Sequence, residues 1–145
     1  MKVEIKEGFS ETEVIIKCSE ITADITKMKV MLINGFKQKL TGVKDGSSFL
    51  IDKQDVLYFE SVDNCSFIYT ADDVYEISLK LYEIENMLST VGFFRNRKSQ
   101  ILNIALIESL RPDFDGRMEV TMKNGEKLIV SRQYAKILKE RLGLK

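Results

Sequence analysis

The sequence contains no histidine and no tryptophan, and among its 145 residues it has one proline and two cysteines. Without histidine the chain can provide neither histidine metal ligands nor a histidine-dependent catalytic triad. Cys18 and Cys65 are too few and too far apart for a disulfide framework or a zinc knuckle. We expect both to be ordinary buried residues. A redox role for Cys65, which lies in a polar loop, is the alternative.

Long hydrophobic runs are also absent. No apolar stretch approaches the roughly 18 residues that a membrane-crossing helix needs, and the N-terminus, MKVEIKEGFSETE, lacks the apolar core of a signal peptide. We therefore expect a cytoplasmic protein. The glycines match neither a dinucleotide-binding fingerprint nor a phosphate-binding loop, and no serine lies in a G-x-S-x-G motif. The sequence thus predicts no enzyme, no cofactor and no metal site.

The zero net charge conceals an asymmetry along the chain. The 22 basic and 22 acidic residues are unevenly divided: residues 91–145 hold 12 basic and 6 acidic side chains, a net charge of +6. Residues 1–90 therefore hold 10 basic and 16 acidic side chains, a net charge of −6. Such a split favours a C-terminal half that faces a polyanion.

The first 47 residues predict a small β-β-α accessory region. VEIKE (3–7) and EVIIKC (13–18) have the pattern of short strands, and a helix follows, with Ser19 as its N-cap and Gly35 as its C-cap. Four apolar residues recur in it at helical spacing: Ile21, Ile25, Met28 and Leu32. A lone amphipathic helix must bury such a stripe, so it belongs either to the core or to a face for dimerisation or partner binding.

Residues 48–145 predict one further domain made mainly of antiparallel strands. Hairpin turns are expected at 62–64 and at 124–125, and another at 44–46 leads into the domain. LKLYEIENML predicts a helix with Ser78 as its N-cap. RQYAKILKERL predicts a last helix after a cap at Ser131. Its inward residues are expected to be Tyr134, Ile137, Leu138 and Leu142.

A run of basic and amide side chains lies in FFRNRKSQILN, residues 93–103. A fully exposed strand would not follow two phenylalanines, and a fully buried one could not hold three unpaired cations. We therefore predict that the chain leaves the core at Phe94 and reaches the surface near Lys98.

The side chains of this run are those that contact nucleic acids. Arginine, lysine, asparagine, serine and glutamine bind phosphate oxygens and base edges. Side chains alternate along a strand, so Arg95 and Arg97 would point away from Asn96. Asn96, Arg97, Lys98 and Ser99 are candidate contacts. The alternative is a solvated basic edge strand whose charges discourage aggregation.

Another cation stands at the start of the last predicted helix, where Arg132 follows the Ser131 cap. A helix N-terminus attracts anions through its free N–H groups, whereas the helix dipole disfavours an arginine there. Arg132 is thus placed poorly for stability and well for phosphate or guanine. Its alternative role is to pair with a nearby acid such as Glu108.

Three stretches, taken in order, resemble the LytTR family of bacterial DNA-binding domains. IDKQDVLYFESVDNCSFIYT (51–70) is similar to the family's opening strands with their D-I-x-Y-I/F-E core. FFRNRKSQILNIALIESL (93–110) resembles the pattern F-x-R-x-H-R-S-x-x-V-N-x-x-x-I-x-x-I. VTMKNGEKLIVSRQYAKILKERL (120–142) resembles the closing hairpin and the S-R start of the final helix. The resemblance runs from about Ser48 to Leu142.

The resemblance implies an α+β, β-rich fold of elongated antiparallel sheets with short helices, which reads major grooves of double-stranded DNA through loops. The family's contact regions match the first turn, with Asn64 and Ser66, the basic segment, with Arg97, Lys98 and Ser99, and the helix start at Arg132. Two further family residues match Arg95 and Asn103. Both could be structural, with Arg95 bridging inward acids and Asn103 holding a turn.

The sequence departs from the family at two places. The usual His-Arg pair is Arg97-Lys98, which keeps the charge but not arginine's fork, and the first turn carries no cation. Only about 47 residues precede the resemblance, too few for the receiver domain of many members, so we expect a stand-alone transcriptional regulator.

We expect this regulator to bind double-stranded DNA, as a homodimer on repeated half-sites, with a membrane or cytosolic protein partner as a source of signals. The alternative is a protein-interaction module whose basic edge is only a solvated face.

Overall fold

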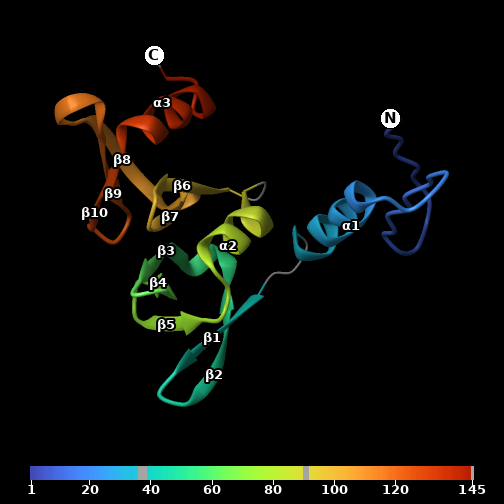
Figure 1. The fold of residues 1–145 in the computed structure, drawn as a ribbon, viewed down its shortest axis with the longest axis horizontal. Helices are drawn as coiled ribbons and strands as arrows, with labels where there is room; N and C mark the ends of the chain where they lie inside the picture. The colour runs from blue at the N-terminus through green and yellow to red at the C-terminus, as the bar shows by residue number, and fades with distance from the viewer. Residues whose placement is uncertain (36–38, 90–91, 145) are drawn as a thin grey trace.

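The computed structural model describes residues 1–35, 39–89 and 92–144, and these form two antiparallel sheets and three α-helices (Figure 1). The strands are β1 (Lys39–Lys44), β2 (Ser47–Asp52), β3 (Val56–Val62), β4 (Cys65–Thr70), β5 (Val74–Ile77), β6 (Phe93–Arg97), β7 (Gln100–Asn103), β8 (Ile107–Pro112), β9 (Met118–Met122) and β10 (Lys127–Val130). The helices are α1 (Ala23–Gly35), α2 (Leu81–Leu88) and α3 (Arg132–Arg141), with 3₁₀ turns η1 (Lys53–Asp55), η2 (Ile104–Leu106) and η3 (Phe114–Gly116). The β-rich α+β class is confirmed.

The larger sheet has seven strands in the order β2-β1-β5-β4-β3-β7-β6. One of its faces is covered by α2, which buries Ile84 and Leu88 against Phe59, Ile68 and Ile101. This helix begins later than predicted, because its N-cap is Lys80 and not Ser78. The backbone N–H of the cap donates to the Glu83 carboxylate at 3.1 Å, which satisfies one of the free groups at the helix start.

The smaller sheet has the order β10-β9-β8 and forms a second core with the opposite face of β3, β6 and β7. The alternation predicted for β9 is confirmed, since Met118, Val120 and Met122 are buried. The last helix closes this core with Leu138 and Ala135. Ile137 was wrongly placed inward. It is 50% exposed, and the small Ala135 occupies the inward position instead.

The predicted turns are confirmed, each with the left-handed backbone that tight hairpins require. The β3–β4 turn has φ of 51° at Asp63 and 64° at Asn64, and Asp45 at the β1–β2 turn also has φ of 51°. The β9–β10 connection is longer than a two-residue turn, spanning residues 123–126, because Asn124 Oδ1 accepts from the Glu126 N–H at 3.1 Å.

The N-terminal region differs from its prediction. Residues 1–22, all of which the structure describes, form no strand, so the expected strands at 3–7 and 13–18 are absent. Val3 and Ile5 are 83% and 89% exposed, and a two-stranded hairpin without a covering layer is marginal in water. The predicted helix is present as α1. It begins at Ala23 and is capped by Thr22, not by Ser19.

The predicted stripe of α1 is partly correct. Ile25, Met28 and Leu32 are half-buried, whereas Ile21 precedes the helix and is 81% exposed. This helix contacts α2, and Figure 1 shows it at one end of the molecule with the smaller sheet and α3 at the other. Division into 1–47 and 48–145 stays a prediction. β1 (Lys39–Lys44) nevertheless pairs with both β2 and β5 and so is part of the larger sheet.

Both cysteines were wrongly expected to be buried. Cys18 lies in the irregular segment before α1, Cys65 follows the β3–β4 turn, and both are free and exposed. A redox role for Cys65 stays a prediction. Among the described residues, no helix has the length and apolar character needed to span a bilayer.

Candidate nucleic-acid interface

Two backbone hydrogen bonds bring the three predicted contact regions together. The Ser61 N–H donates to the Ser99 carbonyl at 2.8 Å, which joins the end of β3 to the turn between β6 and β7. The Ser131 N–H donates to the Asn96 carbonyl at 2.9 Å, which joins the same turn region to the start of α3. The end of β3, the β6–β7 turn and the start of α3 are therefore neighbours, and we call this region, with Asn64, Arg97, Lys98, Ser99 and Arg132, the basic edge.

The β6–β7 turn presents the predicted cations. The Arg97 side chain is 42% exposed, and one of its terminal nitrogens lies 3.8 Å from a carboxylate oxygen of Glu60. Lys98 is exposed, Ser99 is half-buried, and no described residue forms an ion pair with Lys98. The turn thus offers one weakly paired and one unpaired cation to solvent.

Arg95 braces this turn from inside. Its Nε donates to the Arg97 carbonyl at 3.1 Å, a second guanidinium nitrogen donates to the Lys98 carbonyl, and a third contact reaches Glu85 at 3.5 Å. The side chain is only 18% exposed. Arginine's several donors allow one side chain to fix two carbonyls of the turn. Arg95 is therefore structural, but it holds backbone carbonyls and a single half-exposed acid, Glu85, and not several inward acids as predicted.

Asn103 also has a structural role. Its amide nitrogen donates to the Val56 carbonyl at 2.9 Å, and its side-chain oxygen accepts from the Ala105 N–H at 3.1 Å. It is 3% exposed and joins the end of β7 to the start of β3. The second bond caps η2, so Asn103 holds a turn as predicted.

The structure contradicts two predicted contacts. Asn96 is completely buried, with its amide donating to Gln100 Oε1 at 2.7 Å and to the Ile129 carbonyl at 3.0 Å. Ser66 is 3% exposed on the inward side of β4. Neither side chain is accessible to DNA in this arrangement. Asn96 lies two residues after the buried Phe94, on the same side of β6, and it is covered by the smaller sheet through Ile129 of β10.

The first turn has a cation that the sequence prediction missed. Asn64 is exposed, as a contact requires, and its carbonyl accepts from Lys80 Nζ at 2.9 Å. Lys80 is the N-cap of α2 and lies 16 residues away in the chain, so the turn's own sequence gave no sign of it. The sequence placed Lys80 inside the first turn of the predicted helix, and nothing there connected it with the β3–β4 turn.

Arg132 is the first residue of α3 and is 74% exposed. Its ion-pair partner is Asp115, at 3.7 Å, and not Glu108, which the sequence suggested as a possible partner. Gly116, with φ of 78°, lies directly beside it, since a Cβ there would come within 2.9 Å of the Arg132 side chain. The η3 loop therefore supports the stem of Arg132 and leaves its charged end at the surface.

Three buried polar atoms at this edge have no hydrogen-bond partner among the described residues: Asn96 Oδ1, Arg97 Nε and Ser131 Oγ. Ser131 is the N-cap of α3 as predicted, but its hydroxyl makes no capping bond. An unpaired buried donor or acceptor costs about 1–3 kcal/mol. The surrounding packing must therefore hold this junction in place.

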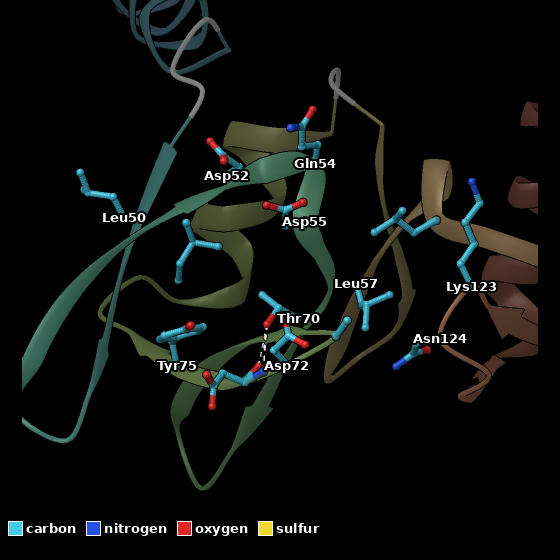
Figure 2. Close-up of a pocket in the computed structure, with 14 residues that line it drawn as sticks. Leu50, Asp52, Gln54, Asp55, Leu57, Thr70, Asp72, Tyr75, Lys123 and Asn124 are labelled. Atoms are coloured by element: carbon cyan, nitrogen blue, oxygen red, sulfur yellow. Dashed lines mark hydrogen bonds between the residues drawn. The ribbon is translucent and has the colours of Figure 1, made fainter.

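A hollow lies elsewhere, between the β2–β3 region, the β4–β5 turn and the β9–β10 loop (Figure 2). Its lining includes Asp52, Asp55 and Asp72, with Lys123 on the opposite wall. An acidic surface repels a polyanion, so it is unsuited to nucleic acid. Within the described part of the chain, no cluster of three or more acidic or cysteine side chains could hold a metal ion.

Comparison with known proteins identifies the family. The family model described as "LytTr DNA-binding domain" matches residues 46–143. The chain belongs to the LytTR family. A solved LytTr DNA-binding domain from Bacillus cereus superposes with a TM-score of 0.71 at 26% identity, covering 74% of this chain and 99% of that one. Residues 46–143 are therefore a DNA-binding domain and not an enzymatic one.

Curated relatives of the LytTR chain are named as sensory transduction proteins or as transcriptional regulators. The sensory transduction protein LytT of Bacillus subtilis is 34% identical over 96 residues, covering 66% of this chain and 40% of the relative. LytT of Bacillus cereus is 30% identical over 137 residues, covering 94% of this chain and 51% of the relative. A Staphylococcus aureus protein named as an HTH-type transcriptional regulator is 31% identical over 105 residues, covering 72% of this chain and 71% of the relative.

The chain thus spans about 40% to 51% of the length of the two LytT relatives. The described residues contain no doubly wound receiver domain, because every strand pairing in both of their sheets is antiparallel. They also lack two α-helices in succession, the arrangement of a helix-turn-helix, since strands separate α1, α2 and α3.

Proposed function

We propose that this LytTR protein is a transcriptional regulator that binds double-stranded DNA in a sequence-specific manner. The observation that carries the proposal is the single edge formed by three distant segments, with Lys98, Arg132 and Asn64 all exposed on it. Loops, and not one recognition helix, would then enter neighbouring major grooves.

The side chains of this edge divide into two kinds of contact. Lys98 and Arg97 lie at the tip of a turn, where cations reach phosphate oxygens without regard to sequence. Arg132 lies at a helix start and carries a planar fork, which can donate two hydrogen bonds to the O6 and N7 of a guanine. Ser99 and Asn64 supply shorter polar groups. Specificity would therefore depend mainly on Arg132.

A pair of such edges would suit repeated half-sites. We propose a homodimer, or two monomers bound side by side, because a single small edge gives few base contacts and two together multiply affinity. A cytoplasmic location follows from the proposed target, chromosomal DNA. A membrane or cytosolic protein partner would provide the signal.

A protein-interaction module is the second candidate, favoured by the exposed apolar side chains of the N-terminal region. Val14 and Ile15 are 57% and 66% exposed, and Val30, Met31 and Ile33 of α1 are each about half exposed. Exposed apolar patches on soluble proteins commonly mark interaction sites. The two functions are compatible, since one uses the basic edge and the other uses the opposite end of the molecule.

A mobility-shift titration on the protein's own upstream region tests the proposal. We expect wild type to bind with an affinity that falls steeply as salt rises, because phosphate contacts release counterions. The double variant Lys98→Ala/Arg132→Ala should lose most of this affinity. Arg111→Ala is the matched control, because Arg111 on β8 is also an exposed, acid-paired arginine, 2.9 Å from Glu119 on β9. Equal binding by the control and double variants would reject the site.

A further inference from the structure

A chain of three polar side chains, Asn96 and Gln100 buried and Glu60 half-buried, leads to Arg97 at the basic edge. The Asn96 amide donates to Gln100 Oε1 at 2.7 Å, and the Gln100 amide donates to Glu60 Oε2 at 3.0 Å. The other Glu60 oxygen lies 3.8 Å from the Arg97 guanidinium. Asn96 and Gln100 are 0% and 1% exposed. Asn96, Gln100 and Glu60 are not proposed DNA contacts, but the chain of contacts that they form leads to Arg97, which is one.

Asn96 also joins the two sheets. Its side-chain amide donates to the Ile129 carbonyl of β10 at 3.0 Å, and its backbone carbonyl accepts from the Ser131 N–H at 2.9 Å. These bonds fix the connection from β10 into α3, and thus the position of Arg132. The same residue is linked through Gln100 to Glu60 and Arg97. One buried residue therefore connects both groups of proposed contacts.

We propose that Glu60, Gln100 and Asn96 form a positioning network that sets the spacing between the β6–β7 turn and Arg132 and thereby determines DNA specificity. This inference rests on the proposed DNA-binding function. Contacts on two sheets can match bases only if the sheets keep a fixed relation, because a displacement of about 1 Å exceeds the tolerance of a bidentate hydrogen bond.

Simple stabilisation does not account for the network. Burying amides and a carboxylate costs free energy unless every group is paired, and apolar side chains of equal volume would support the fold at least as well. Hydrogen bonds differ from apolar packing in that they fix direction and register. A directional link suits a junction that must hold two loops at a defined spacing.

Exchange of the two side chains tests the network. In Gln100→Glu, the amide donor that faces Glu60 becomes an acceptor, so two carboxylates oppose each other at pH 8. In the double variant Glu60→Gln/Gln100→Glu, an amide again faces a carboxylate and the net charge equals that of wild type. For each protein, the dissociation constant is measured on its selected binding site and on a scrambled duplex, with thermal unfolding recorded alongside.

We expect Gln100→Glu to lower the ratio of specific to non-specific affinity about tenfold, the size of one misplaced hydrogen bond. The double variant should restore most of the ratio. In addition, Arg132→Ala should reduce specific affinity less in the Gln100→Glu background than in wild type, because a misplaced Arg132 has less to lose. A purely structural network would alter unfolding temperature without this coupling, and that result would overturn the inference.

If Gln100→Glu fails to fold, Glu60→Gln alone provides the test. The glutamine keeps an oxygen that accepts from Gln100, but it has no charge to pair with Arg97. Arg97 is then free to bind phosphate, so non-specific affinity should rise about threefold and the ratio of specific to non-specific affinity should fall. An unchanged ratio would contradict the network. Failure of the proposed function is distinguishable, because in that case wild type itself would not prefer any sequence over the scrambled duplex.

Discussion

Replacement of Arg132 by alanine isolates the proposed base contact. The side chain is 74% exposed, and its only ion pair in the described structure is the 3.7 Å contact to Asp115. A surface pair of this kind contributes about 0–1 kcal/mol to folding. Thermal stability should therefore change little, and any large change in DNA binding can be assigned to the contact itself.

The expected loss of DNA affinity follows from comparing Arg132 bound to guanine with Arg132 paired with Asp115. A bidentate contact to guanine is worth about 1–3 kcal/mol, and DNA must displace Asp115, which offsets up to about 1 kcal/mol of it. We expect a net loss of about 1–2 kcal/mol, or roughly 5- to 30-fold in affinity. If the same side chain also neutralises a phosphate, the slope of log affinity against log salt should fall by about one.

Fluorescence anisotropy on a labelled duplex carrying the selected site, at four or more salt concentrations, measures both quantities. Single-base variants of the duplex should identify one position where wild type discriminates and Arg132→Ala does not. Arg111→Ala, at an exposed and acid-paired arginine on β8, supplies the control. Equal affinity losses in the two variants, or discrimination retained at every base position, would refute the assignment of Arg132.

Three further predictions concern other residues. Lys98→Ala should weaken binding to all duplexes about equally and lower the salt slope by about one, because Lys98 would contact phosphate; anisotropy on specific and scrambled duplexes measures this. Asn103→Ala should lower the free energy of unfolding by about 1–3 kcal/mol, since it leaves the buried Val56 carbonyl unpaired; urea denaturation measures this. Tyr58→Phe should abolish the part of the loss of folding stability at alkaline pH that ionisation of Tyr58 causes. The pKa of Tyr58 is raised, first by burial and then by the 2.9 Å hydrogen bond to Glu126.

The sign of the Tyr58 effect follows from the direction of its pKa shift. The folded pKa lies above that of the unfolded chain, so its contribution is complete below about pH 10 and is lost as pH rises toward the folded pKa. The difference in unfolding free energy between wild type and Tyr58→Phe should therefore shrink above pH 10. A constant difference would contradict the Tyr58 prediction. A Lys98→Ala defect confined to one DNA sequence would contradict the Lys98 prediction. An Asn103→Ala protein as stable as wild type would contradict the Asn103 prediction.

Features encoded locally were predictable. Turns with Asp-Gly or Asp-Asn require left-handed backbone that few residues accept, and both turns formed where expected. The alternation of Met118, Val120 and Met122 identified the inward face of β9. In a sheet that is covered on one face, alternating apolar residues can all be buried in only one orientation of the strand. The three family motifs, found in the expected order, allowed the fold of residues 48–142 to be predicted from the family resemblance.

Features that depend on tertiary partners were not predictable. The segments 3–7 and 13–18 have strand patterns, but strand formation depends on a neighbour and a covering layer, which they lack in this structure. The burial of Asn96 depends on the smaller sheet, whose distant residue Ile129 accepts a hydrogen bond from its side chain. Lys80 joins the Asn64 turn only because α2 begins beside it.

Selection of bound fragments from genomic DNA, followed by footprinting of wild type and Arg132→Ala, tests the central claim most directly. We predict a recurrent short motif, present as spaced repeats, with protection in adjacent major grooves. In the variant, protection of one guanine within each repeat should be lost. Recovery of fragments without a common motif, or identical footprints for the two proteins, would contradict the assignment of a sequence-specific interface to this edge.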